Sequence, residues 1–221
     1  MPVTRIGGEF RVELAGKEVV GGDAGGEVGA VVRHAGNEGL LRGDHIIGMD
    51  KVYITFQPDL AVPGALDAIE GLTKKAAQAG VKKLVLLSGK GEREAELCEQ
   101  VVMHSGLDYT IVRASWFMQN FSESFFLDPI LAGQVALPKP QAKVPYVDTG
   151  DIADVVVEVL LNDLHNGQIY ELTGPRLLTF EEVIKEISLA TERDIAFNEV
   201  SLADYIGFLK AADVPADYVW L

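Results

Sequence analysis

The chain has 221 residues, of which 48% are hydrophobic and 24% charged, a composition typical of a soluble globular chain with a sizeable core. Its formal net charge of −14 at pH 7 argues against binding to nucleic acid, which relies on clustered positive charge. A lone cysteine, Cys98, excludes an internal disulfide, and no apolar stretch approaches a membrane span, so we expect a cytoplasmic protein that does not enter a membrane. The histidines lack ligand spacing, and we predict no metal site.

Residues 1–50 are rich in glycine but lack the arrangement that binds a dinucleotide. Such a fold should open with a strand, a G-x-x-G-x-x-G or G-x-G-x-x-G turn and then a helix, so that N–H groups at the helix start receive the pyrophosphate. Neither pattern occurs here in that context. The N-terminal part is therefore the part of the chain whose structure the sequence predicts least well.

The clear pattern begins with a buried strand over 52–56, which ends at Gln57-Pro58. A helix over about 63–79 follows, with four apolar residues on its buried side and Gly80 as its stop. These apolar residues are Leu66, Ile69, Leu72 and Ala76.

A second apolar run, over 84–87, has no polar alternation and is expected to be a strand buried on both faces, as in a parallel sheet. A helix over 93–105 and a strand over 109–113 follow it. The apolar stripe of this helix comprises Ala95, Cys98, Val101, Val102 and Ser105, whereas Glu92, Glu94, Glu96, Glu99 and Gln100 are expected to lie mostly off it. Because ligands bind beyond the carboxyl ends of parallel strands, residues 88–90 and 114–120 are the first candidates for a binding site.

Beyond the aromatic segment at 116–121, shorter strands and helices are predicted. They are a strand over 144–147, a helix starting at Asp148, a strand over 168–173, a helix opened by the capping box of Thr179 and Glu182, a strand over 195–200 and a helix capped by Ser201.

Four segments carry a resemblance to a known family: LLSGKGE (86–92), SGLDYTIVRASWFMQNF (105–121), VPYVDTGDIAD (144–154) and IYELTGP (169–175). They closely resemble the NmrA-like group of the atypical short-chain dehydrogenase/reductases, which includes NAD(P)H-dependent quinone and azo reductases. The resemblance runs from about Val52 to the C-terminus, and its specificity lies in the occurrence of four separate motifs in order.

The resemblance implies an α/β fold with a Rossmann-like, doubly wound, mostly parallel sheet and a small C-terminal α/β lobe. We expect a single NAD(P)-binding-like domain over 1–221. Its Rossmann core would comprise about 1–115 plus 144–173, and its small lobe about 116–143 plus 174–221.

The resemblance also implies NADP or NAD as the cofactor, with NADP preferred. The candidate cofactor-binding residues are Arg33, Phe56, Gln57, Pro58, Ser88, Gly89, Lys90, Ser115, Trp116 and Phe117, and the candidate substrate-binding residues are Trp116 and Asn120. Alternatives stay open: Arg33 as a solvated cation at a strand end, Pro58 as a strand terminator and Lys90 as a solvated loop lysine. Trp116 and Phe117 would otherwise pack the small lobe onto the sheet.

The N-terminal part departs from the family's pattern. Val3 and Thr4 correspond to the end of the family's first strand, but Arg5 stands where its first glycine belongs. Residues 27–33 resemble the family's second strand. The interval from there to the strand at 52–56 is too short for a helical crossover plus a further strand, so this part is expected to be truncated, rearranged or divergent.

No catalytic residue can be assigned from the sequence. Ordinary short-chain dehydrogenases use a tyrosine with a lysine four positions on, whereas Tyr109 has Arg113 at that distance and the other tyrosines also fail. The leading hypothesis is therefore an NAD(P)H-dependent oxidoreductase that transfers hydride directly to a quinone-like or other small electrophilic acceptor, with water supplying the proton. The alternative is a non-catalytic dinucleotide-sensing regulatory or scaffold protein. A homodimer is left open.

Overall fold

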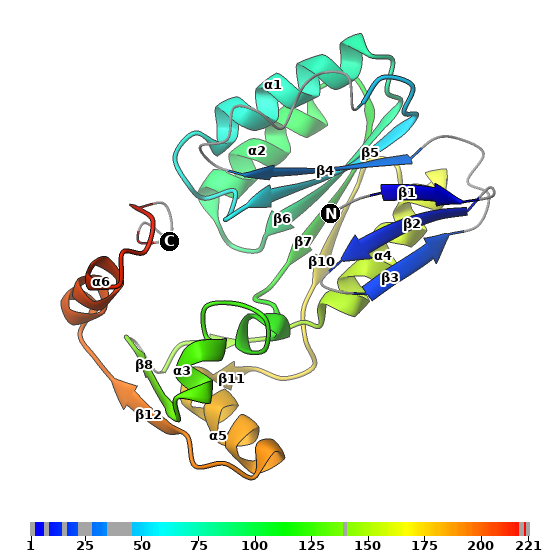
Figure 1. Cartoon of the computed structure of the whole chain (residues 1–221). Coiled ribbons are helices and arrows are strands. Elements are labelled where there is room, and N and C mark those ends of the chain that lie inside the picture. The colour runs from blue at the N-terminus through cyan, green and yellow to red at the C-terminus, as the bar shows by residue number, and fades with distance from the viewer. Residues whose placement is uncertain are drawn as a thin grey trace. The chain divides into compact units, whose positions relative to one another are not determined.

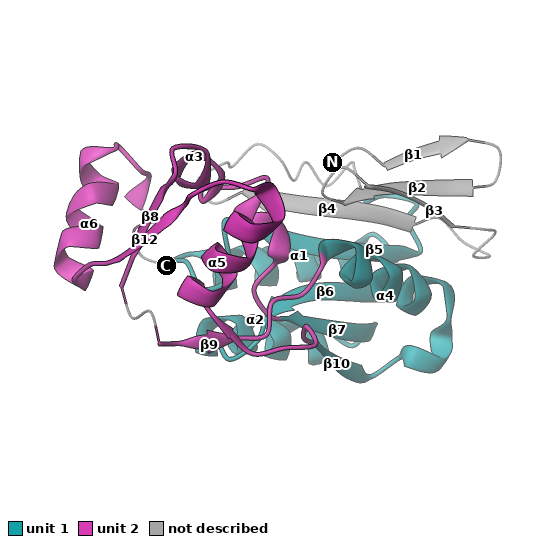
Figure 2. Cartoon of the chain, turned by 90° about the horizontal axis from the view of Figure 1, so that it is seen from below, with its two compact units in different colours: residues 1–114, 149–172, 221 teal, residues 115–148, 173–220 magenta. Residues whose placement is uncertain are grey.

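The structure is a computed structural model that describes residues 46–138, 141–216 and 219, and the backbone of four strands within 3–34 (Figure 1). The chain forms two compact units (Figure 2). Unit 1 comprises residues 1–114, 149–172 and 221, and unit 2 comprises residues 115–148 and 173–220.

Unit 1 is built on a five-stranded sheet in which every neighbouring pair of strands is parallel. The strands, in spatial order, are β10 (Gln168–Leu172), β7 (Asp108–Ala114), β6 (Lys83–Gly89), β5 (Lys51–Gln57) and β4 (Val28–His34). The predicted parallel sheet is thus confirmed. Its inner strands consist largely of apolar and β-branched residues because helices cover both of their faces.

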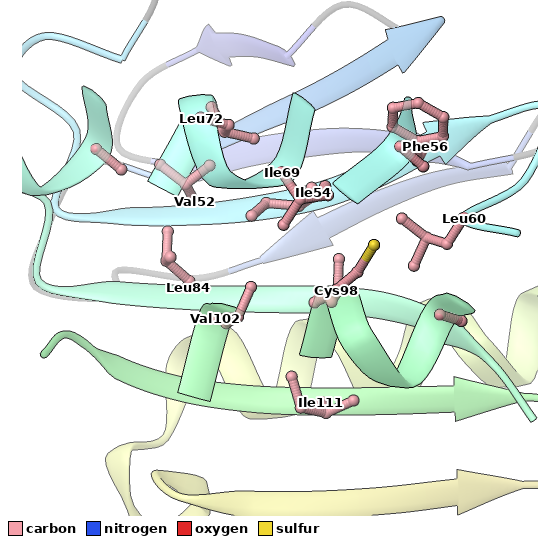
Figure 3. Packing of buried hydrophobic residues seen from close by; sticks show 14 of the residues in the cluster. Val52, Ile54, Phe56, Leu60, Ile69, Leu72, Leu84, Cys98, Val102 and Ile111 are labelled. Atoms are coloured by element: carbon pink, nitrogen blue, oxygen red, sulfur yellow. The ribbon is translucent and has the colours of Figure 1, made fainter. Parts of the chain in front are cut away.

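Helices α1 (Ala65–Gln78) and α2 (Arg93–Met103) lie on one face of this sheet, and α4 (Thr149–Leu161) lies on the other (Figure 1). Successive side chains of each strand point to opposite faces of the sheet. Val52, Ile54, Phe56, Leu84 and Ile111 point into a cluster with Ile69 and Leu72 of α1 and Cys98 and Val102 of α2 (Figure 3). Leu86 belongs to the same cluster. The predicted helix stop is confirmed, since Gly80 follows α1 with a φ of 82°, which favours glycine.

On the α4 face, two lysines from the amino ends of the strands hold the end of the helix. Lys83 is 1% exposed and its Nζ donates to Val159 O at 2.6 Å and to Asn162 O at 3.3 Å. Lys51 Nζ donates to Leu160 O at 2.9 Å. Ammonium groups are favourable here because the last carbonyls of a helix carry partial negative charge.

The N-terminal residues form a separate sheet. Strands β1 (Val3–Ile6), β2 (Glu9–Leu14) and β3 (Lys17–Gly21) pair antiparallel in the order β1-β2-β3. The correspondence of Val3 and Thr4 with the family's first strand is therefore wrong, and β4 pairs directly with β5. In the usual doubly wound order, 3-2-1-4-5-6, the first strand would lie between these two. The N-terminal part was expected to be truncated, rearranged or divergent, and the described strands support a rearrangement.

Unit 2 contains short elements. They are the 3-10 helix η2 (Met118–Phe121), α3 (Leu127–Leu131), β8 (Gln134–Leu137), β9 (Lys143–Val144), β11 (Leu178–Thr179), α5 (Phe180–Thr191), β12 (Ala196–Glu199) and α6 (Leu202–Ala211). β9 pairs with β11 antiparallel, and β8 pairs with β12 parallel. The strand predicted over 144–147 is shorter than expected, because Val147 instead forms a bridge with Phe117.

The predicted capping box at the start of α5 is confirmed. Thr179 Oγ1 accepts from Glu182 N–H at 3.2 Å, and a Glu182 oxygen accepts from Thr179 N–H at 2.7 Å. We expect Thr179→Ala to lower the free energy of unfolding of unit 2 by about 1 kcal/mol, because the Glu182 N–H at the helix start loses the hydroxyl that accepts its hydrogen bond. Urea titration followed by circular dichroism measures this, and an unchanged midpoint would contradict it.

No helix among the described residues is long and apolar enough to cross a membrane.

Candidate functional site

The carboxyl ends of β5, β6 and β7 lie at one edge of the sheet, as the sequence predicts. At this edge the sheet separates into two parts. The ladder between β4 and β5 runs to the pair His34 and Gln57, and the ladder between β6 and β7 runs to Gly89 and Ala114. The ladder between β5 and β6 instead stops at Ile54, so their last three residues are unpaired with each other.

Two carboxyl groups meet where β5 and β6 separate. Asp59 follows β5, and one of its oxygens accepts from Ala61 N–H at 2.8 Å. Glu92 precedes α2, and its carboxyl lies directly over Gly89: a Cβ built on this glycine would stand 2.0 Å from Glu92 Oε2. The Glu92 carboxyl interacts with that of Asp59, and its buried Oε2 has no hydrogen-bond partner.

Burial, above all, raises the pKa of Glu92 to about 7, and the charge and hydrogen bond of Asp59 and the charge of Glu94 act in the same direction. Glu92 therefore keeps its proton to a higher pH than an ordinary glutamate does. The edge can both donate and accept hydrogen bonds through these carboxyls, whereas a pair of ionised carboxylates could only accept.

A second polar network lies on β6, β7 and α2. Glu99 is fully buried, and Arg113 donates to it twice, from Nε at 2.8 Å and from Nη2 at 2.6 Å. Ser88 Oγ also donates to Glu99, at 2.6 Å. The sequence prediction that Glu99 lies off the buried stripe is wrong, because the arginine and the serine make its burial tolerable.

This network continues to β10. Glu171 accepts from Arg113 Nη1 at 3.4 Å and forms an ion pair with Lys90. The hydrogen bond from Lys90, followed by that from Arg113, holds the pKa of Glu171 below its ordinary value. The backbone N–H of Lys90 donates to Ala114 O at 3.0 Å. The loop after β6 is therefore fixed at both its backbone and its side chain.

The candidate cofactor residues fall into two groups. In unit 1, Phe56 is 9% exposed and belongs to the core, Gln57 is exposed, and Pro58 is half-buried after a cis peptide bond. Ser88, Gly89 and Lys90 follow at the neighbouring strand end. Arg33 lies in β4 opposite Phe56, and its side chain lies outside the described residues.

The remaining candidates lie in unit 2. Trp116 is 39% exposed, and its ring packs edge-on against Phe180 at 5.3 Å between centroids. Ser115, Phe117 and Asn120 are half-buried, and Asn120 N–H donates to Phe117 O at 3.2 Å. The structure thus brings the candidates together within each unit, and their role in binding stays a prediction.

Sequence reasoning missed Asp59 and Glu92 as a pair. The available signal was that each acidic residue follows the end of a buried parallel strand by a few positions, where ligand-facing groups gather. For Glu99, the signal was its position four residues after Ala95 and three before Val102, which places it on the buried side of α2.

Comparison with known proteins gives relatives that include a reductase. No family model matches. Prestalk A differentiation protein A of Dictyostelium discoideum is 29% identical over 160 residues, which cover 72% of this chain and 52% of that protein. The NAD(P)H azoreductase of Xenophilus azovorans is 31% identical over 165 residues, which cover 70% of this chain and 56% of that protein. The chain thus spans about half the length of these relatives.

Among solved structures, the NADPH-dependent quinone oxidoreductase QOR2 of Escherichia coli, complexed with NADPH, matches with a TM-score of 0.68 and 20% identity. The match covers 80% of this chain and 64% of that chain. It shows that the fold is Rossmann-like, as the sequence predicts.

Proposed function

Because the chain belongs to the NmrA-like group of atypical short-chain dehydrogenase/reductases, we propose that it binds NADPH or NADH and reduces a quinone-like or other small electrophilic acceptor. The observation that carries this proposal is the kinship with NAD(P)H azoreductase over 70% of the chain. The parallel strand ends at one edge of unit 1 supply the matching architecture. We place the protein in the cytoplasm.

The described groups at this edge fit the nucleoside part of such a cofactor. Carboxyl groups such as Asp59 and Glu92 suit ribose hydroxyls and a carboxamide, whereas they repel phosphate. Gly89 leaves room for the Glu92 carboxyl over the backbone of the loop. A glycine turn for the pyrophosphate is absent from the described strands and helices, since β1 is followed by β2 and not by a helix.

In this proposal, the loop of Ser88, Gly89 and Lys90 holds the nucleoside, and the fixed network behind it keeps the loop in place. The reduced nicotinamide supplies a hydride when bound. Trp116 offers a flat apolar surface for an aromatic acceptor, and Asn120 offers a polar anchor.

The alternative is a dinucleotide-sensing regulator without turnover. The separate antiparallel sheet of β1, β2 and β3 favours it, because these strands stand in the part of the chain that normally supplies the pyrophosphate turn.

Adding NADPH and NADH separately to the purified protein tests the proposal. We expect NADPH to quench the fluorescence of Trp116 and to raise the melting temperature, since a ligand at 100 times its Kd stabilises the folded state by about 2.7 kcal/mol. A Trp116→Phe variant should lose the quenching and keep the thermal shift. NADPH consumption with a small quinone then separates an enzyme from a sensor. No change in fluorescence or melting temperature with either nucleotide would contradict binding.

A further inference from the structure

We propose that Glu92, held against Asp59 where β5 and β6 separate, is the proton donor that completes reduction of the acceptor. This inference rests on the proposed function and replaces water as the source of the proton. It is built on the position of the two carboxyls at the ligand-binding edge of the sheet, on the close packing of Glu92 over Gly89 and on the buried oxygen of Glu92 that no other group satisfies.

The first step is position. Glu92 lies beside the loop that carries Ser88, Gly89 and Lys90, and it therefore stands next to the residues predicted to hold the nucleoside. Its partner Asp59 comes from the other side of the separated strands. A carboxyl bridging this separation is placed where ligands bind in open parallel sheets.

The second step is the charge around the pair. Burial is the largest effect that opposes ionisation of Glu92. The carboxyls of Asp59 and Glu94, which face it, act in the same direction. The Cys98 thiol also faces Asp59, and burial raises its pKa to about 11, so it stays neutral. The neighbouring cations are engaged elsewhere: Lys90 with Glu171, and Arg113 with Glu99 and Glu171. Glu92 therefore keeps a proton at pH values where a free glutamate has lost it.

The third step is chemistry. Reduction of a carbonyl acceptor adds a hydride and leaves one oxygen as an anion, which must gain a proton. The O–H bond of the Glu92 carboxyl breaks as the new O–H bond of the acceptor forms, and solvent then returns a proton to the carboxylate. An acid with a pKa near the working pH is the most effective donor. Tyr53, at 1% exposed, and Tyr146, at 4% exposed, are buried phenols with raised pKa values and do not compete.

The Glu92→Gln variant tests this in two ways, with Glu96→Gln as the matched control four residues away on the exposed side of α2. In the enzyme assay with NADPH and a small quinone, E92Q should lower kcat by about 100-fold with a much smaller change in KM, and remove the loss of rate above pH 7. E96Q should keep both the rate and its loss above pH 7. Gly89→Ala, which displaces the Glu92 carboxyl, should move the loss of rate to lower pH.

The second measurement uses the protein without nucleotide. Because the folded protein holds the Glu92 proton more tightly than the unfolded chain, its stability falls as pH rises from 4.5 to about 7 and is then constant. The difference in melting temperature between E92Q and wild type should therefore grow over this window and reach about 4 °C at pH values above 7, whereas E96Q should show no such change.

The outcomes separate this inference from the proposed function. Wild-type turnover with an unchanged rate and pH profile in E92Q would overturn the proton donor and leave the reductase intact. Failure of the wild type to oxidise NADPH with any quinone would overturn both. A melting-temperature difference that does not change between pH 4.5 and 7 would overturn the protonated pair, whatever the activity.

Discussion

Replacing Arg113 with methionine is expected to lower the free energy of unfolding of unit 1 by about 3–5 kcal/mol. The Glu99 carboxylate is fully buried and receives two hydrogen bonds from the guanidinium of Arg113, at 2.8 and 2.6 Å. Methionine fills part of the volume but leaves this charge with the Ser88 hydroxyl as its remaining partner. Urea titration followed by circular dichroism gives the change in free energy.

The chain offers a matched control for this variant. Arg176 also binds a glutamate through two hydrogen bonds, to Glu186 at 2.8 and 2.7 Å, but both side chains are exposed. We expect Arg176→Met to be far milder, because water solvates Glu186 once its partner is lost. The double variant Arg113→Met with Glu99→Gln should recover part of the stability, since it removes the buried charge as well. Equal losses in R113M and R176M would show that burial of Glu99 does not matter.

Replacing Gly174 with alanine is expected to destabilise unit 2 by at least about 3 kcal/mol. A Cβ on Gly174 would stand 1.7 Å from the carbonyl oxygen of Tyr146 and 2.7 Å from its carbonyl carbon. Because these are backbone atoms, no side-chain rotation relieves the contact. The hydrogen bond from Gly174 N–H to Pro145 O, 3.0 Å long, would be lost with it.

Gly207→Ala in the same unit is the control for this prediction. Gly207 lies in α6, and a Cβ there would meet nothing within 4 Å. Alanine should therefore stabilise the helix by about 0.5–1 kcal/mol. Thermal unfolding of both variants, followed by tryptophan fluorescence, measures the contrast. A G174A protein that melts at the wild-type temperature would mean that the two segments do not approach as closely as the structure places them.

The elements of unit 1 from β5 to β7 were predictable because each has one strong pattern. The strand at 52–56 and the helix at 63–79 appear as β5 (Lys51–Gln57) and α1 (Ala65–Gln78), with shifts of one or two residues. Ile69, Leu72 and Ala76 of α1 are buried at helical spacing, as predicted, although Leu66 is exposed. Val52, Ile54 and Phe56 form one apolar face of β5, so local sequence determines the type of both elements.

The N-terminal sheet was not predicted, although this part of the sequence carries a hairpin pattern where a dinucleotide fingerprint would be expected. Strands β1 and β2 are separated in sequence by Gly7-Gly8, and polar and apolar residues alternate in β2. A two-residue Gly-Gly connection between such runs is typical of a hairpin. The antiparallel pairing of β1 with β2 agrees with this sequence pattern.

The sequence predicts at which edge of the sheet the candidate site lies, but not which side chains pair there. Parallel topology dictates that the residues after β5, β6 and β7 gather, and this much follows from the order of the elements. The pairing of Asp59 with Glu92, and of Arg113 with Glu99, depends on side chains from elements far apart in the sequence. Periodicity carries no information on such pairs.

Because unit 1 is made mainly of two separate segments of the chain, it cannot be isolated by a single truncation. A fragment ending at Ala114 would lack α4 and β10, and the buried ammonium of Lys83 would lose its acceptors at Val159 and Asn162. The two ends of the segment 115–148 lie close together, since Val147 N–H donates to Trp116 O at 2.9 Å. A short linker from residue 114 to residue 149, in a chain that stops at 172, is therefore the appropriate design for isolating unit 1.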